Sequence, residues 1–229
     1  MKNIKYLAIC ALVAMSLTSC DKDTEGLTDM IYYPVITLDG GYVAIPMGGT
    51  YEEPGYVATL GTEDLTGQVI VANNINNQKL GKYQVTYSVM SPEGFLASES
   101  RDVYVASPGQ IQNIYFGESQ YGSRHYYNAP IKVLDNGDGT YTVDDILGGF
   151  YCYGRYPSYL GVMDFFADAV FHLEGDAVVL DEVGSWYFDQ YPITIVEGIY
   201  DAASETFTLD LDFDGDPVYV QLVGIQLTN

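Results

Sequence analysis

Short runs of alternating apolar and polar residues, separated by glycine-containing turns, are the feature that most constrains the fold of this chain. In the clearest run, residues 82–90, tyrosine or valine occupies every second position and polar residues lie between them. Because successive side chains of a strand point to opposite faces, this period of two predicts a half-buried β-strand. The chain has 24 glycines, which supply the turns that many short strands need. We therefore expect an all-β protein.

Composition and charge limit the possible partners. Hydrophobic residues make up 48% of the 229 residues, so the chain can bury a core and is not globally disordered. The 31 acidic residues outnumber the 9 Lys and Arg residues, which gives a formal net charge of -22. A polyanion such as nucleic acid would be repelled, and so would an anionic lipid surface. We therefore predict no nucleic-acid partner.

The N-terminus has the pattern of a secretory signal. Lys2 and Lys5 precede an apolar stretch at residues 6–17. This stretch is shorter than the roughly 20 apolar residues that span a bilayer, and its length is typical of a signal peptide. We predict a lipoprotein signal peptide at residues 1–19.

The residues that follow suggest how the chain is anchored. Leu17-Thr18-Ser19-Cys20 resembles the bacterial lipobox, which implies cleavage before Cys20 and lipidation of its thiol. Two or three acyl chains hold a protein stably on a membrane. The polar stretch 21–25 resembles the acidic export signal of Bacteroidota surface lipoproteins, although it could equally be a plain solvated tether. We expect the lipidated cysteine and tether at residues 20–29, on an outer membrane and facing the cell exterior.

Cysteine usage leaves no intramolecular disulfide in the mature chain. Cys10 lies in the signal peptide and Cys20 is the predicted lipidation site, so Cys152 would be the one free thiol. Cys152 lies between two tyrosines and has no adjacent basic residue to lower its pKa. A buried structural thiol is therefore favoured over a nucleophile.

The first domain is predicted at residues 30–106. The run 82–90, the turn 91–94 and the returning run 97–105 form a hairpin. The sequence Gly81-Lys-Tyr-Gln-Val-Thr-Tyr-Ser-Val89, followed by Arg101-Asp-Val-Tyr-Val105, resembles the last hairpin of bacterial immunoglobulin-like surface domains. This resemblance implies an immunoglobulin-like β-sandwich that serves as a spacer or platform. Pro108-Gly109 then marks a domain boundary.

The second domain is predicted at residues 110–229. Its connections are short, which favours antiparallel neighbours in a meander that closes as a barrel or folds as a sandwich. Strands are expected at residues 126–133, 141–143, 169–173, 177–180, 193–200, 206–213 and 218–227. The run 139–151, Gly-Thr-Tyr-Thr-Val-Asp-Asp-Ile-Leu-Gly-Gly-Phe-Tyr, resembles the C-terminal domain of Bacteroidota lipoproteins that pair an immunoglobulin-like module with an uncharacterised β-rich domain. The resemblance assigns no activity, although many such proteins accompany glycan-uptake systems.

Two aromatic clusters, at residues 150–166 and 186–191, are the main candidates for a binding site. Aromatic rings stack on the apolar faces of sugars, and Tyr and Trp add a polar tip. Trp186 is the only tryptophan and follows Gly184-Ser185, so we expect it in a loop. The alternative is that these rings fill the core of a wide barrel. The candidate ligand-binding residues are Tyr153, Arg155, Tyr156, Tyr159, Trp186 and Tyr187.

The acidic turns provide weaker candidates for calcium. Residues 210–215 fit the first six positions of an EF-hand loop, but the twelfth position is Gln221 rather than Glu. A strand with a charged outer face is the better interpretation, and a partial site at Asp214 and Asp216 stays open. The acidic turn 135–138 is similar. We predict no defined metal site.

No pattern predicts catalysis or a cofactor. Carboxylate pairs at 144/145, 164/168 and 181/182 arise by chance among so many acidic residues, whereas a glycosidase needs a pair placed across a cleft. His125 and His172 lack partners at metal-binding spacing, and hydrogen-bonded strand histidines are favoured. We therefore predict a lipid-anchored, non-catalytic surface protein that binds a glycan. The alternative is a structural or interaction subunit, such as an adhesin or accessory lipoprotein with an outer-membrane protein partner, and a glycoside hydrolase is the least favoured possibility.

Overall fold

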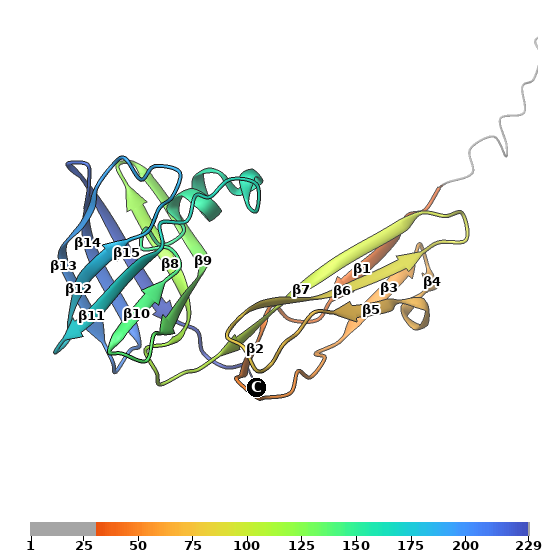
Figure 1. The fold of residues 1–229 in the computed structure, drawn as a ribbon. Coiled ribbons are helices and arrows are strands. Elements are labelled where there is room, and N and C mark those ends of the chain that lie inside the picture. The colour runs from red at the N-terminus through yellow and green to blue at the C-terminus, as the bar shows by residue number, and fades with distance from the viewer. Residues whose placement is uncertain (1–30, 229) are drawn as a thin grey trace, which may run out of the picture. The chain divides into compact units, whose positions relative to one another are not determined.

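The structure, a computed structural model, describes residues 31–228 and is almost entirely β (Figure 1). The predicted signal peptide, the lipidation site Cys20 and the tether at residues 20–29 lie outside the described residues. Within residues 31–228, no helix combines the length and the apolar composition that crossing a bilayer requires.

The first part of the chain forms two packed sheets. One sheet has the order β1-β3-β4 and the other has the order β2-β7-β6-β5. A short 3-10 helix, η1 (Thr66–Gln68), lies between β4 and β5. The strand bounds are β1 (Pro34–Leu38), β2 (Val43–Pro46), β3 (Tyr56–Leu60), β4 (Glu63–Asp64), β5 (Ile70–Asn73), β6 (Gly81–Met90) and β7 (Leu96–Ala106).

The hairpin predicted from the alternating run is confirmed. Strand β6 pairs with β7 in antiparallel register from Gly81 with Val105 to Met90 with Leu96. Val85, Tyr87 and Val89 are buried, whereas the polar residues between them are more exposed. Alternation along one strand therefore predicted which face turns to the core.

Arg101 on β7 connects two loops of this domain through hydrogen bonds. Its side chain is 2% exposed, and its guanidinium donates to the carbonyl oxygens of Asp39, Gly41 and Gly55 at 2.6–2.9 Å. It also forms an ion pair with Glu53, with 3.3 Å between Nη2 and Oε1. A buried guanidinium is tolerated only when its donors are satisfied, so this set of partners explains its position.

The second part of the chain is a closed eight-stranded antiparallel barrel. The strand order is β10-β11-β12-β13-β14-β15-β8-β9, and the first strand, β8, closes the barrel against the last, β15. The strand bounds are β8 (Asn113–Tyr121), β9 (Arg124–Asp135), β10 (Thr140–Val143), β11 (Ala169–Glu174), β12 (Ala177–Val183), β13 (Ile193–Asp201), β14 (Thr206–Phe213) and β15 (Asp216–Gly224). A barrel was one of the two predicted forms. Because β9 pairs with β10, the sheet closes on itself and has no edge strand.

The expected strands of this domain are confirmed, with one additional strand and shifts of one to three residues at several bounds. Strand β8 was not expected, and the last strand ends at Gly224 rather than at residue 227. The barrel interior is filled by apolar and aromatic side chains, each worth about 1.5–3 kcal/mol when fully buried. Its largest members include Tyr115, Ile131, Phe150, Phe171, Trp186, Phe207 and Phe213.

Replacing Arg101 should destabilise the immunoglobulin-like domain strongly. In Arg101→Met, Glu53 loses its cation and three carbonyl groups lose their donor, so we expect a loss of about 3–5 kcal/mol in the free energy of unfolding. Urea denaturation followed by circular dichroism measures this. Lys82→Met is the matched control, because Lys82 forms an exposed ion pair with Asp102 at 2.8 Å and should cost less than about 1 kcal/mol. Equal losses in both variants would show that the buried network contributes little.

Candidate functional site

Two long loops meet at one end of the barrel. Residues 144–168 join β10 to β11, and residues 184–192 join β12 to β13. Alternate connections of an antiparallel meander lie at the same end, and here the two loops are bonded directly: the Tyr187 N–H donates to the Asp164 carbonyl at 2.9 Å. The β14–β15 turn joins them, because the Asp214 N–H donates to the Pro192 carbonyl at 2.9 Å. The helical segments η2 (Phe150–Arg155) and η3 (Pro157–Tyr159) belong to the first loop (Figure 1).

The completely buried carboxylate of Asp145 organises the first loop. One oxygen accepts hydrogen bonds from the Leu147 and Ala167 N–H groups, at 3.0 and 3.4 Å. The other accepts from the Gly149 N–H at 2.9 Å and the Cys152 Sγ at 3.2 Å. Both ends of the loop are therefore attached to one side chain. Burial raises the pKa of Asp145 to about 7, although these hydrogen bonds act in the opposite direction.

Glycine permits the tight turn that follows Asp145. Gly148 and Gly149 have φ angles of 62° and 84°, a backbone conformation that residues other than glycine rarely adopt. A Cβ at Gly149 would also lie 2.2 Å from the Cβ of Ala129 on β9, so only glycine allows this approach. The Gly-Gly pair noted in the sequence thus packs the loop against the barrel wall.

Cys152 is buried as predicted. Burial raises the pKa of its thiol, and the neighbouring Asp145 carboxylate raises it further. The thiol therefore stays protonated and donates to Asp145, which supports a structural role.

Three of the predicted ligand-binding residues gather on one buried ring. The rings of Tyr156 and Tyr187 lie 4.9 and 4.8 Å from Phe165, and the ring of Tyr159 lies 6.2 Å from it. Phe165 is buried, Tyr156 is half-buried, and Tyr159 and Tyr187 are 45% and 50% exposed. We call Tyr156, Tyr159 and Tyr187 the tyrosine platform. It combines residues from both loops.

Arg155 lies at the side of this platform. Its guanidinium carbon is 5.3 Å from the centre of the Tyr156 ring, and the side chain is exposed. A guanidinium stacked on an aromatic face retains free N–H donors at its edge. Arg155 can therefore hold the Tyr156 ring in place and still donate to a ligand.

Two other predicted ligand-binding residues, Trp186 and Tyr153, do not belong to the tyrosine platform. Trp186 lies in the expected loop, but its side chain is only 5% exposed and belongs to the barrel core, as in the core alternative. Its ring lies 5.5–5.9 Å from those of Tyr151, Phe188 and Phe213. The indole fills space among these rings at the end of the barrel core, and close packing of the core explains the inward position.

Tyr153 is also partly buried. Its ring packs edge-on against Phe166 at 5.8 Å, and burial raises its pKa. The core alternative, which was weighed for all these rings, therefore describes Trp186 and in part Tyr153, whereas Tyr159 and Tyr187 of the platform are exposed.

A small pocket of about 200 Å³ lies beside the platform, in the barrel mouth. The Tyr121 hydroxyl donates a hydrogen bond to the Asp216 carboxylate at 2.7 Å, and this hydrogen bond raises the pKa of Tyr121. The pocket thus combines aromatic walls with carboxylate acceptors at the β14–β15 turn. Its lining residues are Tyr121, Tyr151, Phe188, Tyr191, Phe213, Asp214 and Asp216.

Several pocket residues were not candidates from the sequence. Tyr121 lies on the unexpected strand β8, and Phe213 faces inward from β14. Asp214 and Asp216 were considered only as a partial calcium site. No group of three or more potential ligands for a metal occurs among residues 31–228. The acidic turn itself was the available signal for this pocket.

The other titratable candidates are engaged in structural contacts. Asp144 accepts the Lys132 N–H at 2.8 Å, and burial raises its pKa to about 6. His172 bonds Asp181 at 2.9 Å, and His125 bonds Glu118 at 2.7 Å. Both histidines are hydrogen-bonded strand residues, as favoured from the sequence.

The fold defines a class: an all-β protein with an immunoglobulin-like domain followed by a closed antiparallel β-barrel. Residues 36–105 match the family model described as a bacterial surface protein, Ig-like domain. Residues 107–223 match the BT2262-like C-terminal domain. The chain belongs to this BT2262-like family.

One solved structure agrees on the fold. The crystal structure of the lipoprotein BT2262 from Bacteroides thetaiotaomicron is 21% identical, with a TM-score of 0.57, and the match covers 84% of this chain and 100% of that one. A Clostridium perfringens ZmpB structure, of CBM51-2 in complex with GlcNAc and INT domains, is 15% identical over 83% of this chain and 43% of that one. Its TM-score is 0.28, which is too low to carry an argument. A search of curated proteins found no significant match.

Removing the Asp145 carboxylate should loosen the first loop. Asp145→Ala leaves three buried N–H groups without an acceptor, so we expect a loss of about 3 kcal/mol or more in the free energy of unfolding. Asp164→Ala is the control within the same loop, because Asp164 is exposed and accepts one N–H, from Phe166 at 3.2 Å. Chemical denaturation monitored by Trp186 fluorescence compares them. A loss below 1 kcal/mol for Asp145→Ala would contradict the organising role.

Iodide should quench Trp186 emission weakly, because the indole is enclosed by the barrel core. As a positive control, the double variant Trp186→Phe, Tyr187→Trp moves the one tryptophan to the exposed platform position. Its Stern–Volmer constant should be several times larger. Equal quenching of the two proteins would mean that Trp186 is accessible after all.

Proposed function

We propose that this protein is a non-catalytic, glycan-binding surface lipoprotein that contacts its ligand through the tyrosine platform. The observation that carries the proposal is the gathering of Tyr156, Tyr159 and Tyr187 around the buried Phe165 at one end of the barrel. Stacked rings can receive the apolar face of a sugar, while the phenol groups offer hydrogen bonds to its hydroxyl groups.

The surroundings of the platform suit a neutral or amino sugar. Asp214 and Asp216 offer carboxylate acceptors in the neighbouring pocket, and Arg155 offers donors. The net charge of -22 disfavours uronic-acid-rich or sulfated glycans. A pocket of about 200 Å³ is smaller than usual for drug-sized ligands, so it favours one sugar unit with the rest of the chain on the platform.

Ring packing and hydrogen bonds hold the platform in place, which supports a binding role. Tyr156 stacks on Phe165, Arg155 contacts the Tyr156 ring, and the first loop is hydrogen-bonded to Asp145. A site that is already ordered loses little conformational entropy when it binds. The engagement of the Asp144 and Asp145 carboxylates with backbone N–H groups supports a role without catalysis.

We further propose that Cys20 is lipidated after removal of residues 1–19 and that the protein faces the exterior from an outer membrane. The domains at residues 30–106 and 110–229 would then act as spacer and binding module. Membership of a family that includes a Bacteroides lipoprotein supports this arrangement, as does the match to a bacterial surface Ig-like domain.

Loss of the platform should abolish most glycan binding. We expect the purified protein to be retarded in native affinity gels by one member of a panel that includes starch, galactomannan, pectin and gastric mucin. Each aromatic contact is worth about 0.5–1.5 kcal/mol, so Tyr156→Ala, Tyr159→Ala and Tyr187→Ala together should weaken that binding at least tenfold.

Tyr127→Ala is the matched control. Tyr127 is an exposed tyrosine of β9 whose ring contacts His125 at 4.1 Å and not the platform. Unchanged binding by the triple variant would refute the platform. An absence of retardation by every glycan would instead favour an interaction role with a protein partner.

A further inference from the structure

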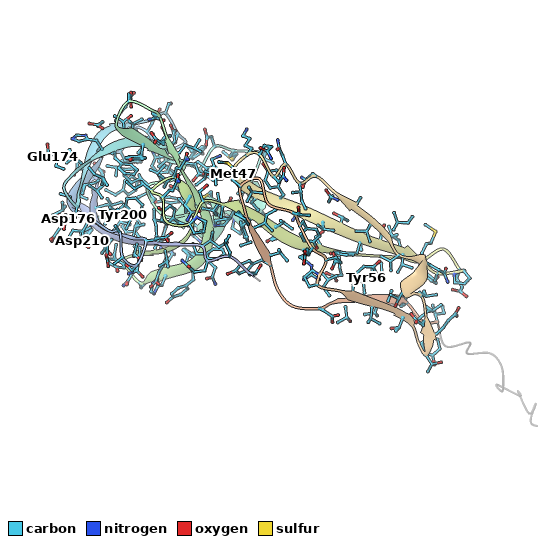
Figure 2. The ribbon with its side chains drawn as sticks, turned by 90° about the horizontal axis from the view of Figure 1, so that it is seen from below. Met47, Tyr56, Glu174, Asp176, Tyr200 and Asp210 are labelled. Carbon is cyan, nitrogen blue, oxygen red and sulfur yellow. The ribbon has the colours of Figure 1, made fainter. Side chains whose placement is uncertain are left out.

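The barrel has one weak seam, between β12 and β13. In the part of the chain that the structure describes, these strands pair at a single position, Ala177 with Ile199. The other seven neighbouring pairs of the barrel register over three to eight positions. Next to this position, the Tyr200 N–H donates to the Asp176 carbonyl at 2.8 Å. Figure 2 labels Asp176 and Tyr200 on the barrel.

The two strands separate beyond that point and leave a groove. A first section of about 630 Å³ is lined by residues 176–180 of β12 and its turn and by residues 194–199 of β13. A second section of about 510 Å³ continues from Leu180 along β12 to Trp186 and returns to Ile193. Leu180 lines both sections, so the groove follows the whole length of the seam.

Local structure explains why the strands meet once and then diverge. Gly198 lets β12 approach closely, because a Cβ there would lie 3.0 Å from the Cβ of Val178. Strand β13 then contains a bulge between Ile195 and Glu197, which leaves Val196 72% exposed. Bulges bend a strand and increase its twist, so β13 turns away from β12.

We propose that this seam binds an extended, basic peptide segment of a partner protein as an added strand. Two facing strand edges without mutual ladder bonds offer backbone N–H and C=O groups, and an inserted strand satisfies both edges at once. A glycan has no amide in its main chain, so it cannot match these groups at the spacing of a strand. Exposed Val196 and Ile199 and half-buried Val179 offer apolar contacts to alternate side chains of the inserted strand.

Charge identifies the occupant as basic. Lys, Arg and His are absent from the described residues that line the two sections, whereas five acidic residues are present. They are Asp176, Asp181, Glu182, Asp189 and Glu197. A second copy of this chain carries the same net charge of -22 and would be repelled, so self-association is disfavoured.

The test uses a fluorescein-labelled ten-residue peptide of alternating valine and lysine, with blocked termini, and the purified protein. We expect saturable binding by fluorescence anisotropy at physiological salt. Hydrogen–deuterium exchange should show that residues 179–183 and 194–197 exchange quickly in the free protein and become protected by the peptide. Glu197→Lys should weaken binding about fivefold, whereas Glu63→Lys, an exposed site on β4, should leave it within twofold.

A second peptide separates strand addition from charge attraction. N-methylation of alternate amides keeps the charge but removes backbone donors, so we expect at least a tenfold loss of affinity. Equal affinity of the two peptides, no binding, or protection elsewhere would overturn the proposal. A concentration-dependent dimer with protection at the seam would assign it to a second copy and would also overturn the peptide partner.

Discussion

The buried carboxylate of Asp145 is the interaction on which the candidate site depends. It accepts hydrogen bonds from residues at both ends of the first loop, so one side chain sets where that loop leaves and rejoins the barrel. Burying a carboxylate is costly unless its oxygens are satisfied, and here four donors meet it. The loop can therefore extend away from the barrel and still present its aromatic rings in fixed positions.

The aromatic residues of the two loops serve two different purposes. Trp186 points into the barrel mouth and replaces the solvent that would otherwise enter it, while the adjacent Tyr187 points outward onto Phe165. Phe165 connects the two layers, because it is buried against Phe188 and carries the platform rings. Apolar filling of the barrel mouth thus supports the surface that we propose contacts a glycan.

Barrel closure leaves one place where pairing is incomplete. Closing a sheet removes its edges and so protects against aggregation. The β12–β13 seam keeps two partly unpaired edges, and the acidic residues along it oppose pairing with another copy of this acidic chain. The platform and the seam share no residue. The second loop contributes to both, because Tyr187 belongs to the platform and Trp186 lines the groove.

Local sequence patterns determined the all-β class, most strands and the hairpin of β6 and β7, because alternation and turn chemistry act between near neighbours. Strand β8 was missed and the strand bounds shifted, since tertiary pairing with β15 and β9 decides them. The sequence also placed Tyr156, Tyr159 and Tyr187 among the candidates. It could not separate them from Trp186, because inward and outward aromatic residues have the same composition. Only the tertiary structure decided that Trp186 fills the core, that Tyr121 and Phe213 join the pocket, and that β12 and β13 part, because each outcome depends on residues distant in sequence that meet when the barrel closes.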